Sequence, residues 1–545
     1  MRLRWLLFAA IGTSAGLLCA QNPPKTVTEF VRTQVGFIRG QTDGQVDRFL
    51  GVPFAAPPVG DLRWKAPSPP QSWSGIRDAT VPASECTQLQ NTKNGQVVTG
   101  SEDCLYLNIY RPANARPRQL IPVFVFIHGG LNHRDSANDY DPTEMVAKTG
   151  IIVVTIDYRL NVFGFLALPS LDSEAGEPSS GNFGLLDQQA ALRWVRDNIL
   201  GFGGDPTNVT VGGESAGGID LCANLASPNA AGLFHKVIME SLYCPAAPHD
   251  EALATSAPVA VAAGCPDPQS AAACLRSKSA ADVLKAAEPL NPIVGGDSAI
   301  PGKGSGFNAS PNFGNDILPL KPSDALASGQ WNWSSVLLGS NHDEAALFVA
   351  PAMIGKVKLP LSVEGYQAVV GFQYGSFAPS VLAEYGLAHY VNPFIAYADE
   401  VTDDSPLGCA LTPLSQTLSA TTQTYRFEFD DDAAPTPGGE ASGQLPGLSL
   451  GAYHGSELQY LFKMTKLPGP QTGPQQQLSE QMIQYWGNFV KTGNPNGSGL
   501  PVWPRYDADT RQILSLRPAG NSVIDDFDTD HHCAFWATAP GPPFK

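Results

Sequence analysis

Short apolar runs alternate with amphipathic segments through the middle of the 545-residue chain. The runs are rich in β-branched and aromatic residues, as strands are, whereas the segment at 188–199 (QQAALRWVRDNI) repeats its apolar positions with a helical period. The strand-like runs lie at 122–127, 151–158, 209–211 and 236–241. Strands that alternate with helices predict an α/β fold with a largely parallel central sheet.

The same pattern continues in the C-terminal half of the chain. Residues 335–338 and 424–429 (TYRFEF) predict two further strands, and residues 477–490 predict an amphipathic helix that packs on the core. Long loops, such as 431–450, connect these elements. The apolar face of the helix carries Leu478, Met482, Trp486, Phe489 and Val490.

The beginning of the chain has the pattern of a secretory signal peptide. Arg2 and Arg4 precede an apolar run at 5–18, and small residues lead to a plausible cleavage position at Ala20. A membrane anchor is the competing interpretation, but the run is shorter than the ~20 residues that span a bilayer and contains glycine, threonine and serine. We therefore expect a signal peptide at 1–20 and a secreted, extracellular protein without a membrane anchor.

The cysteine count fits an oxidising compartment. Removal of a signal peptide takes Cys19 away and leaves eight cysteines, an even number that suits disulfides. Spacing nominates two local loops and one long loop, and leaves two further cysteines as buried thiols or another pair. In that order the cysteines are Cys86 with Cys104, Cys265 with Cys274, Cys409 with Cys533, and finally Cys222 and Cys244.

The formal net charge of −17 limits the binding partners that the protein is expected to have. Nucleic acid and anionic membranes both require a basic face, so neither is expected to bind. Four N-x-S/T sequences are candidate glycosylation sites in a secreted chain, at Asn208, Asn308, Asn332 and Asn496. Asn208 is the least suitable of these, because it enters a predicted strand and is expected to be buried.

The first candidate catalytic segment is 207–225 (TNVTVGGESAGGIDLCANL), which predicts a strand, a sharp turn and a helix. Residues 213–217 form a G-x-S-x-G sequence, in which small flanking residues permit a strained elbow that presents the hydroxyl of Ser215 as a nucleophile. The same five-residue pattern occurs at 12–16 and 447–451, but only the copy at Ser215 has a strand before it and a helix after it. The alternative interpretation is an ordinary glycine turn between strand and helix.

A serine hydroxyl is a weak nucleophile at neutral pH, so Ser215 needs a base, a carboxylate that orients the base, and donors for the developing oxyanion. Behind a G-x-S-x-G elbow, the acid and then the histidine follow the serine along the chain. The base must therefore be one of the downstream histidines, which are His235, His249, His342, His389, His454, His531 and His532.

Four long segments of the chain are distinctive: FLGVPFAAPPVGDLRWKAPSPPQSW (49–73), SEDCLYLNIY (101–110), DYRLNVFGFL (157–166) and GNFGLLDQQAALRWVRDNILGFGGDPTNVTVGGESAGG (181–218). Taken together, they closely resemble the type-B carboxylesterase and cholinesterase-like lipase family. The resemblance implies an α/β-hydrolase fold, with long loop and helical insertions around an active-site gorge, and one catalytic domain at 21–545. It also implies a secreted esterase of the fungal type.

The resemblance also assigns the partners of Ser215. SNHDEAALF (340–348) resembles the acid segment of the family and implies that Glu344 is the carboxylate, although Asp343 stands beside it. GAYHGSELQYLF (451–462) implies that His454 is the base. The order serine, glutamate, histidine is the one required.

The oxyanion hole and a supporting pair follow from the same resemblance. Backbone N–H groups of Gly130, Leu131 and Ala216 are implied as the oxyanion donors, although the family usually has a small residue where this chain has Leu131. Glu214 and Ser241 resemble a buried polar pair behind the histidine. The family also supports the three disulfide pairs nominated by spacing and leaves Cys222 and Cys244 open.

These observations predict a carboxylic-ester hydrolase that works through an acyl-enzyme, with a small-molecule ester as substrate and neither a cofactor nor a metal. The alternatives are a triacylglycerol lipase of the same family and a non-catalytic, cholinesterase-like binding protein. The segment 87–103 has no aromatic residue and few apolar ones, so it encodes neither a choline-binding tryptophan nor an interfacial lid. The oligomeric state cannot be predicted from the sequence.

Overall fold

The computed structural model describes residues 28–92, 95–287, 307–332, 334–350, 361–436 and 449–540. The expected signal peptide and most of the loop expected at 431–450 lie outside these residues. None of the described helices is long and apolar enough to cross a membrane.

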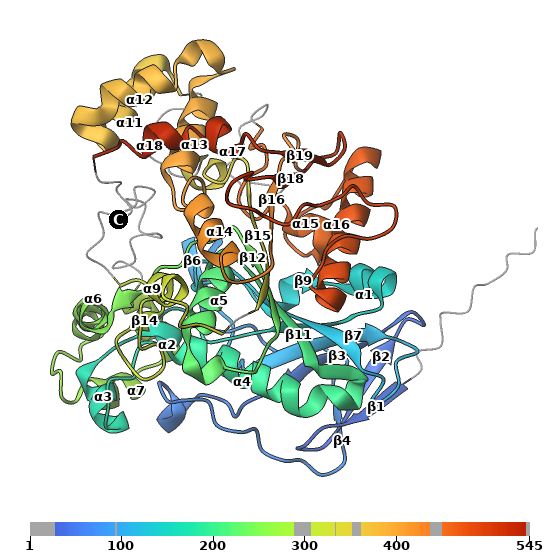
Figure 1. Ribbon diagram of the computed structural model, residues 1–545. Coiled ribbons are helices and arrows are strands. Elements are labelled where there is room, and N and C mark those ends of the chain that lie inside the picture. The colour runs from blue at the N-terminus through green and yellow to red at the C-terminus, as the bar shows by residue number, and fades with distance from the viewer. Residues whose placement is uncertain are drawn as a thin grey trace, which may run out of the picture.

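A thirteen-stranded sheet forms the centre of the described chain (Figure 1). The first strands pair antiparallel, and the seven strands from β10 to β18 in the spatial order pair parallel. The spatial order is β1 (Thr28–Arg32), β2 (Phe37–Thr42), β3 (Val46–Pro53), β7 (Tyr106–Pro112), β10 (Ile152–Ile156), β8 (Ile121–Ile127), β11 (Gly204–Glu214), β12 (Lys236–Glu240), β15 (Ser335–Asn341), β16 (Thr424–Phe429), β18 (Ile513–Leu516) and β19 (Ser522–Ile524), with β4 (Ile76–Asp78) beside β2.

Each strand expected from the sequence is present. The strand expected at 209–211 is longer, because β11 pairs along its length with β8 and β12, whereas the one expected at 151–158 ends at Ile156. Three two-stranded sheets accompany the main sheet: β5 (Gln88–Thr92) with β6 (Gly95–Thr99), β9 (Tyr140–Asp141) with β17 (Lys463–Met464), and β13 (Ala247–Pro248) with β14 (Asn312–Phe313).

Helices lie on both faces of the sheet and beyond its end (Figure 1). The helices α11, α12, α13 and α18 gather together at the top of the view. The helices are α1 (Thr143–Thr149), α2 (Asn161–Phe165), α3 (Pro169–Ala175), α4 (Phe183–Asn198), α5 (Ala216–Ala226), α6 (His249–Ala262), α7 (Ala271–Arg276), α8 (Ala280–Ala287), α9 (Pro322–Ala327), α11 (Val363–Tyr374), α12 (Ala378–Glu384), α13 (Pro393–Asp404), α14 (Leu411–Ser419), α15 (Leu458–Leu461), α16 (Gly473–Thr492), α17 (Phe527–Asp530) and α18 (Cys533–Trp536).

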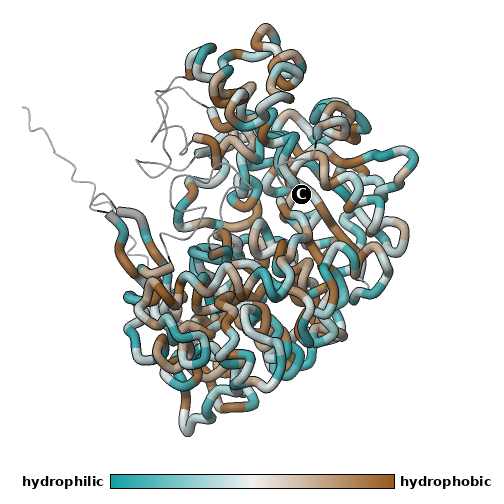
Figure 2. Tube along the Cα trace, turned by 90° about the vertical axis from the view of Figure 1, so that its left-hand side faces the viewer, coloured by the Kyte–Doolittle hydropathy of each residue, from teal (hydrophilic) through white to brown (hydrophobic). Residues whose placement is uncertain are grey.

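Two hydrophobic cores, one on each face, enclose the sheet. Alternate residues of β8 point to opposite faces, so Val123 and Val125 join the core that includes α4 and α5, while Phe124 and Phe126 join the core that includes α1 and α16. Hydropathy accordingly changes over short distances along the chain, as Figure 2 shows. The parallel strands are buried on both sides, which explains their nearly unbroken apolar sequences.

The helix predicted at 477–490 is confirmed as the centre of α16. Its five expected core residues are each no more than 1% exposed. The helix begins at a capping box formed by Thr472 and Gln475 and ends at Gly493, whose φ of 76° is left-handed. These local signals fix the length of α16, and its aromatic face packs on the sheet.

Four disulfides are present, and three join the pairs nominated from the sequence: Cys86 with Cys104, Cys265 with Cys274, and Cys409 with Cys533. The fourth joins Cys222 of α5 to Cys244, whose Cα atoms lie 5.6 Å apart, a pair that the sequence left open. The reason is tertiary, because α5 lies against the chain that leaves β12, where Leu242 contacts Gly218.

The segment between Cys86 and Cys104 is the hairpin β5–β6. Leu89 and Val98 are partly buried and pack against the main core, whereas Val97 is 43% exposed. The hairpin is therefore anchored by apolar contacts at its base as well as by the disulfide.

The four candidate glycosylation sites differ in exposure. Asn308 is exposed, and the other three are half-buried, including Asn208, which was expected to be buried. The side-chain amides of those three donate to main-chain carbonyls, with Asn208 bonded to Lys491, Asn332 to Asn224 and Ser227, and Asn496 to Trp503.

The fourth disulfide leads to a direct prediction. Replacing Cys222 and Cys244 together with alanine removes a cross-link across a sequence separation of 22 residues. The loss of this constraint on the unfolded chain is expected to lower the free energy of unfolding by about 3 kcal/mol. Denaturant unfolding of the variant and the parent protein measures it, and two titratable thiols at these positions in the denatured, unreduced parent would contradict it.

Candidate active site

The turn between β11 and α5 places Ser215 in a strained backbone conformation. Its φ is 55° and its ψ is −124°, and its N–H donates to the carbonyl oxygen of Glu240 at 3.0 Å. Two residues before the serine and two residues after it, only glycine fits. A Cβ on Gly213 would lie 2.5 Å from the carbonyl carbon of Gly217, and a Cβ on Gly217 would collide with the carbonyl oxygen of Ile127 at the end of β8. Close packing between two strand ends and a helix therefore forms the elbow.

The imidazole of His454 is held by one of the two carboxylates that the sequence offered. Nδ1 of His454 donates to Oε2 of Glu344 at 2.5 Å, and Oε1 of Glu344 accepts from the N–H of Asn341 at 2.8 Å. Glu344 is fully buried, and the ring of Phe348 lies 4.8 Å from the imidazole. This contact fixes the orientation of the ring and leaves Nε2 as its other nitrogen.

Asp343 faces a different part of the molecule. Its Oδ2 accepts from the N–H of Ala452 at 2.7 Å, and its Oδ1 lies 3.3 Å from Nδ1 of His342. The structure thus directs Glu344, and not its neighbour, toward His454.

Glu214 connects the imidazole to the elbow. Its Oε1 lies 3.1 Å from Nε2 of His454, and Glu214 directly precedes Ser215. Burial lowers the pKa of His454, but the carboxylates of Glu214 and Glu344 outweigh that effect and raise the pKa to about 9. Burial raises the pKa of Glu214 well above its ordinary value. Glu214 and His454 therefore compete for a proton.

Two further buried carboxyl groups, those of Glu457 and Glu240, lie near Glu214 and His454. No sequence pattern pointed to them. Burial and the nearby Glu344 raise the pKa of Glu457 to about 7, and Glu457 accepts a hydrogen bond from the amide of Asn341. Burial, with Glu457 nearby, raises the pKa of Glu240 well above its ordinary value. The available signals were positional only: Glu457 follows His454 by three residues, and Glu240 directly precedes Ser241.

Ser241 is buried, but its hydroxyl makes no hydrogen bond with any described residue. Its backbone N–H donates to the carbonyl oxygen of Gly339 at 2.8 Å, and its φ of 51° is left-handed. The expected polar pair behind the histidine is therefore represented by Glu214, and the structure does not bring Ser241 into hydrogen-bond contact with the imidazole.

The segment that follows β8 lies directly against the elbow. A Cβ on Gly129 would lie 3.0 Å from the Cβ of Ser215, and Gly130 and Leu131 have left-handed φ values of 81° and 61°. The hydroxyl of Tyr158 donates to the carbonyl oxygen of His128 at 2.9 Å and so supports this turn. Leu131 is half-buried and adopts its conformation despite its side chain.

Three backbone N–H groups are available beside the serine. Those of Gly130 and Leu131 donate to no described residue, and Ala216 is the first residue of α5, where helical N–H groups lack partners. The three candidate oxyanion donors thus lie on two segments that Gly129 and Ser215 bring into contact.

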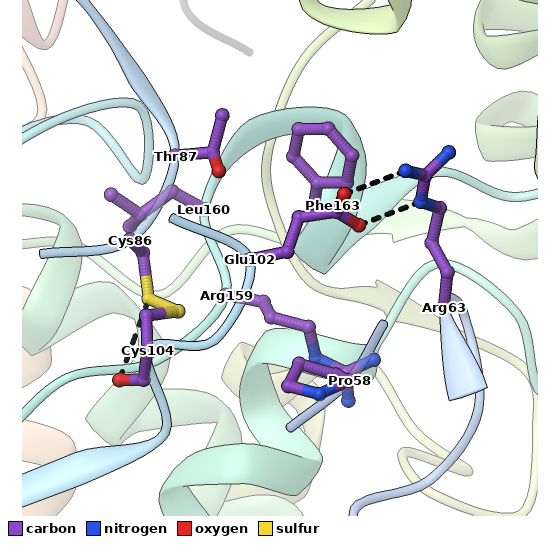
Figure 3. Close-up of a pocket in the computed structure, with 9 residues that line it drawn as sticks. All are labelled: Pro58, Arg63, Cys86, Thr87, Glu102, Cys104, Arg159, Leu160 and Phe163. Atoms are coloured by element: carbon purple, nitrogen blue, oxygen red, sulfur yellow. Dashed lines mark hydrogen bonds and ion pairs between the residues drawn. A yellow bond between two sulfur atoms is a disulfide. The ribbon is translucent and has the colours of Figure 1, made fainter. Parts of the chain in front are cut away.

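A small cavity beside the Cys86–Cys104 disulfide is separate from this site. Its volume is about 10 Å³, and the Arg63–Glu102 ion pair, at 2.6 Å, forms part of its wall (Figure 3). A cavity of that size holds no more than a water molecule. It is therefore too small to bind an ester.

The comparisons with known proteins agree with the fold. A model of the carboxylesterase family matches residues 27–536. The para-nitrobenzyl esterase of Bacillus subtilis is 36% identical over 90% of this chain and 94% of its own, and the medium-chain fatty acyl-CoA hydrolase precursor of Anas platyrhynchos is 33% identical over 89% and 88%. The crystal structure of the carboxylesterase EST55 of Geobacillus stearothermophilus aligns with a TM-score of 0.75 at 30% identity, covering 93% of this chain and 99% of that one.

Together these findings define an enzyme of the α/β-hydrolase fold that hydrolyses carboxylic esters. The chain belongs to the carboxylesterase family. The three relatives are bacterial and avian, and the fungal type expected from the sequence stays a prediction.

The elbow packing predicts that Gly217→Ala will lower kcat/KM by at least about 100-fold, because the new methyl group must displace the end of β8 or the serine. Gly371→Ala is the matched control, since Gly371 is also a helical glycine but has open space around it. Steady-state kinetics on a chromogenic ester, with circular dichroism to check folding, compares the two variants. Equal activities would show that the elbow tolerates a Cβ.

The charge around His454 predicts a shift in the pH profile. An imidazole that acts as a base must be neutral, so kcat/KM is expected to rise with pH through an apparent pKa that lies above the ordinary histidine value. Glu214→Gln removes one of the carboxylates that raise this pKa, so the rising limb should move to lower pH. A profile that stays in place would mean that Glu214 carries no charge in the working enzyme.

Proposed function

We propose that this enzyme hydrolyses soluble carboxylic esters through an acyl-enzyme formed on Ser215, with His454 as the general base and Glu344 as the residue that orients it. The observation that carries the proposal is the position of the imidazole. Its Nδ1 is bound to Glu344 at 2.5 Å, and its Nε2 lies 3.1 Å from the residue that precedes the serine.

The reaction follows from these positions. Oγ of Ser215 attacks the ester carbonyl carbon while Nε2 of His454 takes the hydroxyl proton, and the carbonyl oxygen becomes an oxyanion beside the N–H groups of Gly130, Leu131 and Ala216. The tetrahedral intermediate collapses, and His454 gives the proton to the departing alkoxide, which leaves as an alcohol. Water, deprotonated by the same imidazole, then attacks the acyl-enzyme and releases the carboxylic acid and the free serine.

The substrate class is inferred from the relatives and from the hairpin β5–β6. One relative is named a para-nitrobenzyl esterase and another a medium-chain fatty acyl-CoA hydrolase precursor, and neither name refers to a triacylglycerol or a choline ester. The hairpin offers Val97 as its exposed large apolar residue among those described, and so resembles neither an oil-facing lid nor an aromatic cation trap. A soluble ester is therefore favoured over a triacylglycerol emulsion or a choline ester.

Secretion is part of the same proposal. The chain begins with a signal-peptide pattern at 1–20, and four disulfides suit an oxidising compartment. Asn308, which is exposed, is the glycosylation position that the fold favours, because the other three side-chain amides are engaged with main-chain carbonyls.

The triad is tested by substitution. Ser215→Ala should lower kcat by about a millionfold and abolish labelling by a fluorophosphonate probe. Glu344→Gln should cost on the order of 10⁴ in kcat, because the imidazole loses the acceptor that fixes its tautomer. Asp343→Asn is the matched control and should leave kcat nearly unchanged, since Asp343 faces Ala452. Retained turnover in Ser215→Ala, or equal losses at Glu344 and Asp343, would refute the assignment.

The substrate class is tested with tributyrin. The hydrolysis rate, measured against tributyrin concentration, should show no sharp rise where an emulsion forms, because the hairpin carries no apolar lid. Acetylcholine and an uncharged isostere, assayed in parallel, should be hydrolysed with similar kcat/KM. A rate jump at emulsion onset would indicate a lipase, and a strong choline preference would indicate an aromatic trap elsewhere.

A further inference from the structure

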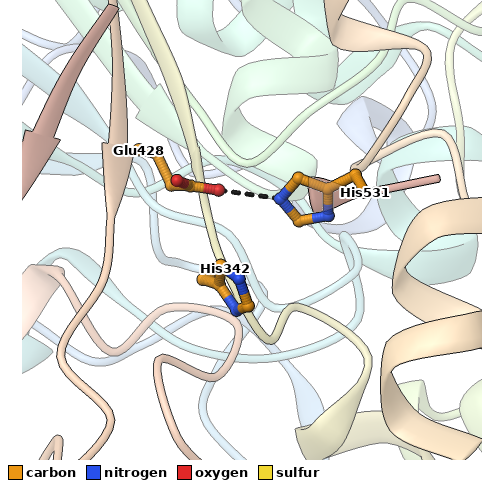
Figure 4. A group of neighbouring side chains, drawn as sticks. All are labelled: His342, Glu428 and His531. Carbon is orange, nitrogen blue, oxygen red and sulfur yellow. Dashed lines mark hydrogen bonds and ion pairs between the residues drawn. The ribbon is translucent and has the colours of Figure 1, made fainter. Parts of the chain in front are cut away.

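A second group of reactive side chains lies beside the loop that follows β15 and carries Asp343 and Glu344, on the side opposite His454. His342 follows β15, Glu428 lies in β16, and His531 follows α17, so three distant parts of the chain contribute one side chain each (Figure 4). One potential ligand atom from each residue lies within 4.8 Å of the other two. Imidazoles and carboxylates are the kinds of side chain that bind zinc in proteins.

The remaining ring nitrogens already face carboxylates. Nδ1 of His531 lies 2.6 Å from Asp403, and Nδ1 of His342 lies 3.3 Å from Asp343. Histidines that bind a metal through one nitrogen usually donate the other N–H to a carboxylate, which fixes the ring. The supporting contacts of a metal centre are therefore present around both rings.

The charge around the group is unbalanced. Glu428, Asp403, Asp343 and Asp530 contact the two imidazoles, which can carry at most one positive charge each. Four carboxylates thus outnumber the available cations among the side chains in contact. A bound divalent cation would offset this excess of negative charge.

We propose that His342, Glu428 and His531 bind one divalent transition-metal ion of the zinc class. His531 contributes Nε2 and Glu428 a carboxylate oxygen, and Asp530, 3.3 Å from Nε2 of His342, stands close enough to become a fourth ligand. Imidazole ligands favour zinc over the hard cations calcium and magnesium.

The geometry permits entry with a small adjustment. The side chain of His342 is 30% exposed and that of Asp530 is 61% exposed, so an ion can reach the group from solvent. Nε2 of His531 and Oε1 of Glu428 lie 2.7 Å apart. Ligand atoms of a tetrahedral ion at about 2.0 Å lie roughly 3.3 Å apart, so this pair must separate, and the ligand atom of His342, within 4.8 Å of both, must approach them.

The ion would act as a structural clamp. It would join β15, β16 and the C-terminal segment close to the Cys409–Cys533 disulfide. Asp343, which supports His342, also accepts from Ala452 two residues before His454, so the clamp would brace the segment that carries the catalytic carboxylate. No substrate contact is assigned to it.

The test is metal titration of the intact enzyme after treatment with a chelator. Calorimetry with Zn²⁺ should give one ion per chain with a Kd of about 10 µM or tighter, and Ca²⁺ should not bind. Co²⁺ should give the visible absorption of a tetrahedral site with nitrogen and oxygen ligands. The Tm should rise with added Zn²⁺.

Variants locate the ion. His342→Ala and Glu428→Gln should each weaken Zn²⁺ binding by at least about tenfold. His532→Ala is the matched control, because His532 has the same 30% side-chain exposure and adjoins His531, but its ring pairs with Glu384. It should bind Zn²⁺ like the parent protein. Absence of Zn²⁺ binding by the parent, undiminished binding by both His342→Ala and Glu428→Gln, or equal loss in His532→Ala would overturn the proposal.

Discussion

The contact of β8, β11 and α5 at the serine elbow is the constraint on which the rest of the site depends. Gly217 lies so close to the carbonyl oxygen of Ile127 that no side chain fits, and a Cβ on Gly129 would lie 3.0 Å from the Cβ of Ser215. This packing holds Ser215 at a positive φ and brings the candidate oxyanion segment against it. The long parallel sheet, buried on both faces, supplies the rigidity that such a strained turn requires.

The second feature that controls the site is a group of buried glutamates near His454. Glu214, Glu240, Glu344 and Glu457 are each no more than 4% exposed; three of them act on the imidazole of His454, and Glu240 lies near Glu214 and Glu457. Burial favours the neutral forms of Glu214, Glu240 and Glu457, whereas His454 favours ionised neighbours. The site is consequently a set of groups that share protons, and the acidity of the histidine is a property of the whole set.

Carboxylates also contact histidines on the other side of the loop that follows β15. There Asp343 turns away from His454 and meets His342, in the group that includes Glu428 and His531. Two adjacent residues, Asp343 and Glu344, thus face two different histidine environments. The loop after β15 is held from both sides, which explains why a carboxylate 110 residues from its histidine keeps a 2.5 Å contact.

The sequence by itself determined what depends on local order: the alternation of strands and helices, the elbow at Ser215 and helix α16. Neighbouring residues fix these features through backbone period and glycine geometry. Only the tertiary structure decided that Glu344 and not Asp343 faces His454, and that Cys222 pairs with Cys244. It also decided that Glu240 and Glu457 lie near Glu214, and that His342, Glu428 and His531 form a separate group. Those contacts join segments from different strands and helices, and only the packing of the whole chain sets the distances between them.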